Sequence, residues 1–325
     1  MKSNPFLENL LLMLALLVGL NYLIYSWHKP QRLKLINRLE TTKRIETLIL
    51  GDSTISIGLL GPDFEKAWKE QRDEDCHSFN AGIPDSTATS HYLNLRKAIR
   101  HHPAIKRVVY GVIGFRLTDG RFLQREGVIR NAFLEYYQEP EIAAGFHREL
   151  RWSGALAFEL ERRIPMFVER RSFWVRVEKA RRRMARSGMR KATEAESPRR
   201  QEFVNFLHRD YAEFLARCRR TADSRADLWA PIREMSRLAR DSGVELTVVF
   251  MPMSQEHQRK FYNTPEWRRY IAHVRRELEG QGVRFIDAID WVDLPDSVAF
   301  PDDIHMTGPA GEIFSRKLAE VIARR

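Results

Sequence analysis

A serine in a tight turn is the first residue whose type and position could do chemistry. The motif Gly51-Asp52-Ser53 follows an apolar run, Thr47–Leu50, that predicts a short buried strand. A serine placed there lies at the carboxyl end of a sheet, the edge at which open α/β folds place their sites. Because Gly, Asp and Ser are also ordinary turn residues, the tripeptide alone is equally compatible with a plain turn.

A carboxylate and an imidazole near the other end of the chain could activate that serine. Asp302 and His305 are three residues apart, just before a predicted helix opened by Thr307, Gly308 and Pro309. In a turn that enters a helix, this spacing lets the carboxylate hold the Nδ1–H of the imidazole, which leaves Nε2 free to face a serine. The alternative is a polar loop in which Asp303 caps the helix and His305 is solvated.

A glycine between these two motifs could stabilise developing negative charge. The stretch Phe79–Gly82 follows a predicted short strand, and Pro84 comes next. A glycine lets its own backbone N–H approach a bound oxyanion closely. Here too the alternative is a plain turn.

The elements that must position these residues alternate between strands and helices. Further strands are predicted at 105–113, 244–251 and 283–286, and amphipathic helices at 88–101, 226–241 and 265–280. This alternation predicts βαβ units and a parallel sheet. Residues 116–225 break the pattern, since they are rich in arginine and aromatic residues, and they predict a mostly helical insertion. Within it, 178–200 is strongly basic and predicts a solvated loop.

The N-terminal residues predict a membrane anchor. Residues 10–27 carry no formal charge, and at about 1.5 Å per residue they span roughly 27 Å, close to a bilayer core of about 30 Å. Tyr22, Tyr25 and Trp27 resemble an interfacial aromatic belt. A cleavable signal peptide and a buried core helix are the alternatives, and the sequence Trp27–Pro30 is a poor cleavage site. We therefore expect an anchor at 1–28, a basic stalk at 29–44 and an α/β domain at 45–325.

The composition narrows the choice of function. The 325 residues carry a net charge of +11, which favours anionic partners such as membrane surfaces, acidic glycans or nucleic acid. No recognised nucleic-acid motif accompanies the basic loop, which favours lipid or glycan. The chain has two cysteines, Cys76 and Cys218, and no Cys/His motif, which argues against a structural zinc site.

Taken in order, the three motifs resemble those of the SGNH, or GDSL-like, hydrolase superfamily. Ser53 matches its first block, Gly82 in Asn-Ala-Gly its oxyanion glycine, and Asp302 with His305 its final DxxH block. The resemblance implies a flavodoxin-like three-layer α/β/α sandwich with a catalytic Ser53–His305–Asp302 triad. It also implies an oxyanion hole made by the N–H groups of Ser53 and Gly82, and a reaction that needs neither metal nor cofactor.

One block departs from the family pattern. The family's third block carries an asparagine that completes the oxyanion hole, whereas the corresponding stretch here, Val112–Arg116, contains none. Losing one such donor costs on the order of 3 kcal/mol of transition-state stabilisation. Arg116 or a backbone amide is the candidate replacement.

The departure, the anchor and the insertion together resemble one branch of the superfamily. This branch includes the D-alanyl-lipoteichoic acid transfer protein and accessory acetyltransferases of exopolysaccharide export. The resemblance implies O-acylation of a cell-envelope polymer with a multi-pass membrane-bound O-acyltransferase as partner, and a catalytic domain in the periplasm or outside the cell. The cations between Lys29 and Arg44 predict the opposite orientation by the positive-inside rule. The alternative function is a non-catalytic SGNH-fold scaffold or glycan-binding subunit.

Overall fold

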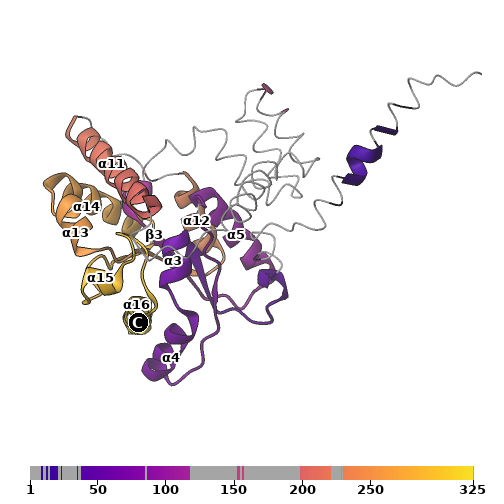
Figure 1. The fold of residues 1–325 in the computed structure, drawn as a ribbon. Helices are drawn as coiled ribbons and strands as arrows, with labels where there is room; N and C mark the ends of the chain where they lie inside the picture. The colour runs from indigo at the N-terminus through magenta and orange to yellow at the C-terminus, as the bar shows by residue number, and fades with distance from the viewer. Residues whose placement is uncertain are drawn as a thin grey trace, which may run out of the picture. The chain divides into compact units, whose positions relative to one another are not determined.

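The chain divides into two units in a computed structural model (Figure 1). One comprises Met1–Lys34 and Arg125–Ala195, and the other comprises Leu35–Gln124 and Glu196–Arg325. The structure describes residues 38–84, 86–117, 198–220, 228 and 230–324, together with residues 9, 12–13, 15–20, 23, 35, 152–153 and 156. Every strand and helix discussed below belongs to the second unit.

Five parallel strands form one sheet in the order β2-β1-β3-β4-β5. Their bounds are β1 Thr47–Gly51, β2 Ser78–Asn80, β3 Arg107–Val112, β4 Glu245–Phe250 and β5 Arg284–Asp287. The middle strands β1, β3 and β4 are buried along almost their whole length, as a sheet covered on both faces requires. The predicted parallel sheet is therefore confirmed.

Helices cover both faces of this sheet. On one face α4 (Gly61–Arg72) packs against α16 (Gly308–Ala323), and on the other α5 (Ala88–His101) packs against α12 (Ala230–Asp241), as Figure 1 shows. Helix α14 (Pro265–Gly280) packs on the edge strand β5. Right-handed crossovers, the rule for parallel strands, would place helices on both faces when the strand order is β2-β1-β3-β4-β5. The result is the predicted α/β/α sandwich.

One long helix from the predicted insertion belongs to the sandwich. Helix α11 (Pro198–Arg220) packs on α14, where the ring of Phe214 lies 4.9 Å from that of Tyr270. Its Tyr211 hydroxyl lies 2.8 Å from the hydroxyl of Tyr262, which ends a short π-helical turn, η3 (Gln258–Tyr262). Each such aromatic burial contributes about 1.5–3 kcal/mol. Most of the remaining insertion, including nearly all of the basic segment 178–200, lies outside the described residues.

The predicted anchor also lies largely outside the described residues. Among the residues that the structure describes, no helix is both long enough and apolar enough to span a bilayer. Cys76 and Cys218 are both buried, and they are not joined in a disulfide.

Candidate active site

Ser53 opens a short helix that follows the first strand directly. This helix, α3, spans Ser53–Gly58, and Asp52 is its N-cap. The Asp52 carboxylate accepts hydrogen bonds from the backbone N–H of Thr54 at 2.9 Å and from its hydroxyl at 2.7 Å. Such a cap stabilises a helix by about 1 kcal/mol. Ser53 is the first helical residue, a position whose N–H has no acceptor within the helix.

Two glycines let α3 lie directly on the end of the sheet. Gly51 of β1 and Gly111 of β3 are paired across the two strands. A Cβ atom at Gly51 would lie 2.5 Å from the Gly111 carbonyl oxygen and equally close to Ile55 of α3, and Gly51 also has a φ of +147°. A Cβ atom at Gly111 would collide with the same isoleucine. Side chains at either position would therefore push α3, and Ser53 with it, away from the sheet.

The segment before α16 holds His305 against Ser53. Asp302 Oδ1 accepts the backbone N–H of Ile304 at 3.1 Å and that of His305 at 2.8 Å, which closes a turn. Asp302 Oδ2 lies 2.8 Å from His305 Nδ1, and His305 Nε2 lies 2.8 Å from Ser53 Oγ. The structure thus brings these three side chains into one hydrogen-bonded chain, as the sequence predicts.

The electrostatics of this chain favour one tautomer of His305. Burial raises the pKa of Asp302, but hydrogen bonds from the side chain and backbone of His305 outweigh burial and lower that pKa overall. Asp302 is therefore ionised at neutral pH and accepts the Nδ1–H of the imidazole. The Nε2 lone pair then points at the Ser53 hydroxyl, the arrangement that a general base needs. The ring of Phe203 on α11 lies 5.9 Å from that of His305.

The N–H of Gly82, which the sequence predicts as the second oxyanion donor, has an acceptor within its own loop. That N–H donates to Asn80 Oδ1 at 2.9 Å, so in the structure it is already engaged. The same Asn80 donates through Nδ2 to the carbonyl oxygens of Ile55 and Leu59, at 3.1 and 2.8 Å. Asn80 therefore ties the loop after β2 to α3. No sequence signal marks this role of Asn80, because an asparagine beside Ala-Gly at a strand end is an ordinary turn residue.

Gly82 also has a packing role. A Cβ atom there would lie 2.8 Å from both the backbone nitrogen and the Cα of Ser56. The glycine is needed because the loop approaches the backbone of α3 closely. The side chain of Arg116, the candidate replacement donor, lies outside the described part of the chain. Gly114, two residues earlier, has a φ of +59° and lies under Tyr211 of α11.

The chain is similar to solved structures, but it matches no sequence family. No family model and no curated protein matches the chain. It is similar to the crystal structure of a lipase/acylhydrolase from Enterococcus faecalis, with 13% identity over 86% of this chain and 97% of that one, at a TM-score of 0.40. It is also similar to the crystal structure of TesA, with 10% identity over 86% of this chain and 99% of that one, at a TM-score of 0.39. At this level of similarity the chemistry of the site is derived from its geometry alone.

Proposed function

We propose that this protein is a serine esterase or acyltransferase. The observation that carries the proposal is the unbroken chain from Asp302 Oδ2 through the His305 imidazole to Ser53 Oγ, with 2.8 Å at both contacts. These are the distances at which a general base takes a hydroxyl proton. The three residues come from opposite ends of the sequence, and the fold places them together at the carboxyl edge of the sheet.

The proposed reaction proceeds through an acyl-enzyme. Ser53 Oγ attacks an acyl carbonyl while His305 Nε2 takes the hydroxyl proton, and Asp302 stabilises the resulting imidazolium. His305 then returns the proton to the leaving group, which leaves the acyl group as an ester on Ser53. In the second half His305 takes the proton of an acceptor hydroxyl, which attacks this ester; the bond between the acyl carbon and Ser53 Oγ then breaks, and His305 returns the proton to Ser53 Oγ. Water as acceptor gives hydrolysis, and a sugar or polymer hydroxyl gives transfer.

Stabilisation of the oxyanion is the weak part of this site. The N–H of Ser53, at the start of α3, is one donor, but Gly82 can supply a second only after Asn80 Oδ1 releases it. Each missing donor costs about 10²–10³ in turnover. We therefore expect slow hydrolysis of simple esters, with faster turnover if a bound acceptor or partner moves Asn80.

We further propose that the enzyme is anchored in the plasma membrane and acylates a cell-envelope polymer outside it. Described helical residues of the N-terminal stretch, among them Leu12, Leu16 and Val18, have exposed side chains, as lipid-facing residues would. The net charge of +11 suits an anionic polymer or headgroup surface. A multi-pass membrane O-acyltransferase would supply the acyl group. An alkaline phosphatase fused after Arg325 should be active, because this enzyme needs export to form its disulfides; an inactive fusion would place Ser53 inside the cell.

The engaged N–H of Gly82 also supports a second candidate, a non-catalytic scaffold with the same fold. The two candidates differ in whether Ser53 catalyses ester turnover. We expect full-length protein in detergent to hydrolyse a chromogenic acetyl ester, and Ser53→Ala to lower the rate at least about 10³-fold. Ser56→Ala, which removes a neighbouring hydroxyl from the same helix, is the matched control and should keep the rate. Equal rates for the wild type and Ser53→Ala would favour the scaffold.

A further inference from the structure

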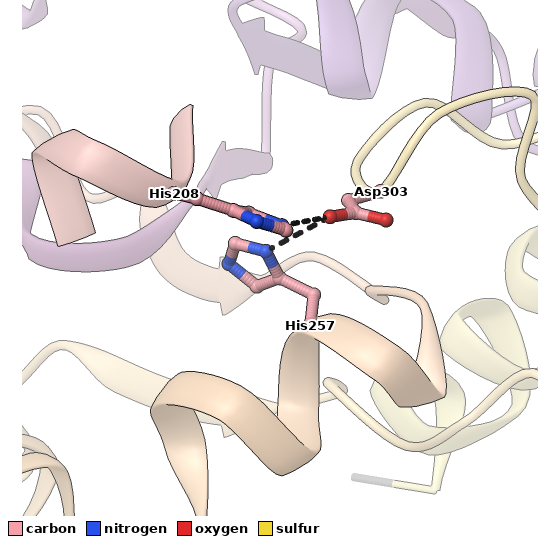
Figure 2. A group of neighbouring side chains, drawn as sticks. All are labelled: His208, His257 and Asp303. Carbon is pink, nitrogen blue, oxygen red and sulfur yellow. Dashed lines mark hydrogen bonds and ion pairs between the residues drawn. The ribbon is translucent and has the colours of Figure 1, made fainter. Parts of the chain in front are cut away.

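Three potential metal ligands meet beside the proposed triad without belonging to it (Figure 2). His208 comes from α11, His257 from α13 (Gln255–His257), and Asp303 from the turn before α16. His208 Nε2 lies 2.5 Å from Asp303 Oδ2, and His257 Nδ1 lies 3.6 Å from the same oxygen. One ligand atom from each residue lies within 4.8 Å of the other two, and both rings face the carboxylate in Figure 2.

His257 is the unusual member of this group. Its side chain is fully buried, and neither ring nitrogen has a hydrogen-bond partner among the described residues. The rings of Tyr211 and Phe261 lie 4.5 and 4.7 Å from it. Buried polar groups nearly always have a partner, because leaving one unpaired is costly. Its Nδ1 faces the Asp303 carboxylate at 3.6 Å, too far for a hydrogen bond but close enough for both atoms to bind one ion.

We propose that His208, His257 and Asp303 bind a divalent transition-metal ion, for which Zn²⁺ is the best fit. Two imidazole nitrogens and one carboxylate oxygen form a three-ligand set that suits Zn²⁺ and leaves one position open. No pattern in the sequence predicts this metal site, because its ligands are far apart in the chain and belong to two helices and a turn. It therefore escapes the Cys/His motifs by which zinc sites are recognised.

One ligand-to-ligand distance already fits a tetrahedral site, and another must lengthen. Metal–ligand distances of about 2.0–2.2 Å place neighbouring tetrahedral ligands about 3.4 Å apart. The 3.6 Å between His257 Nδ1 and Asp303 Oδ2 already fits, whereas the 2.5 Å contact between His208 Nε2 and Asp303 Oδ2 is a hydrogen bond that must open. The ion would replace the shared proton, which moves to His208 Nδ1 or to solvent. His208 can make this movement because its side chain is 21% exposed.

The surroundings support both the orientation of the ligands and an open position. Ser254 Oγ donates to Asp303 Oδ1 at 3.1 Å and so orients the carboxylate, as outer hydrogen bonds do around bound metals. His208 and Asp303 also line a cavity of about 250 Å³, which has room for water or a ligand group at the fourth position. Because Asp303 follows Asp302 directly, the ion would fix the turn that carries His305.

Titration of the full-length protein with Zn²⁺ tests the proposal. Protein stripped with a chelator should bind one equivalent of Zn²⁺, gain thermal stability on binding, and give with Co²⁺ the visible absorption of a tetrahedral site. His257→Phe keeps a ring in the same space, and it should weaken Zn²⁺ binding at least about 100-fold, as should His208→Asn. His101→Ala, which removes an exposed histidine on α5, is the control and should bind like the wild type.

Two results would overturn the proposal: no rise in melting temperature with Zn²⁺, or unchanged affinity in His257→Phe or His208→Asn. The cluster would then be a hydrogen-bonded pair beside a buried imidazole. If His257→Phe fails to fold by circular dichroism, the more exposed His208→Asn decides alone. Ser53→Ala should bind Zn²⁺ like the wild type, so the outcome does not depend on the proposed catalytic activity.

Discussion

Replacing Asp302 by asparagine should separate the catalytic role of this residue from its structural one. Asparagine keeps an oxygen that can accept the N–H groups of Ile304 and His305, which Asp302 Oδ1 holds at 3.1 and 2.8 Å. The turn should therefore survive. The amide nitrogen would replace Oδ2, which lies 2.8 Å from His305 Nδ1, and would donate where the carboxylate accepted.

This exchange forces the other tautomer of His305. With Nδ1 as an acceptor, the ring proton moves to Nε2 and points at Ser53 Oγ, 2.8 Å away. The imidazole can then no longer take the serine proton. In a serine triad this change lowers kcat by about 10⁴, or about 5.4 kcal/mol. The loss should still be smaller than for removing His305 itself.

Ester hydrolysis and thermal unfolding, measured on the same preparation, test this prediction. We expect Asp302→Asn to lose activity while its melting temperature stays near that of the wild type. Asp302→Ala should lose activity and also have a lower melting temperature, since each lost hydrogen bond to a charged group costs about 1.5–3 kcal/mol of stability. Asp296→Asn, which changes a half-buried carboxylate that accepts the first N–H groups of α13, should keep its activity. A loss below about tenfold in correctly folded Asp302→Asn would refute the tautomer argument.

Three further predictions concern the triad, the loop after β2 and the start of β1. The double variant Ser53→Ala/His305→Ala should be no slower than either single variant, because residues that act as one unit are not additive; multiplying defects would show independent roles. Gly82→Ala should lower stability by about 1–3 kcal/mol and should also lower activity, because a Cβ atom would lie 2.8 Å from the backbone of α3. Gly280→Ala is the control, since a Cβ atom there meets open space and should not destabilise the fold. Equal melting temperatures for the two variants would contradict the packing role. Burial raises the pKa of Glu46, but hydrogen bonds from Arg44 and from the backbone of His77 outweigh burial and lower that pKa below 4.5. Glu46 therefore stabilises the fold above about pH 4.5, and this contribution is lost as the pH falls through the lowered pKa. Glu46→Gln should therefore be less stable than the wild type by about 1–3 kcal/mol at pH 7 and approach it in acid, and a gap in unfolding free energy that does not change with pH would contradict this.

The sandwich could be predicted because each of its main elements has a local signal. The apolar run 47–50 matches β1 to within one residue, and the run 244–251 contains β4. The amphipathic segments 88–101 and 265–280 coincide with α5 and α14. Helix α12 begins at Ala230 rather than at 226. The boundaries of α11 were not predicted, since its contacts are with Trp267 and Tyr270 of a distant helix and not with its neighbours in sequence.

The site could be predicted only where its residues follow local patterns. The turn that binds Asp302 to His305 is local, and the position of Ser53 after a strand is local as well. The engagement of Gly82 by Asn80 depends on the carbonyl groups that end α3, which the sequence does not place. The His208–His257–Asp303 cluster depends on how α11 docks, so no pattern in the chain points to it.

Labelling with a fluorophosphonate probe, followed by peptide mapping, tests the central claim most directly. Only a serine activated by a neighbouring base should react. We expect the label on Ser53 in the wild type, none in Ser53→Ala, and almost none in His305→Ala, which retains the serine but lacks the base 2.8 Å from its Oγ. An unlabelled Ser53 in folded wild-type protein, or equal labelling of Ser53 in His305→Ala, would contradict the account.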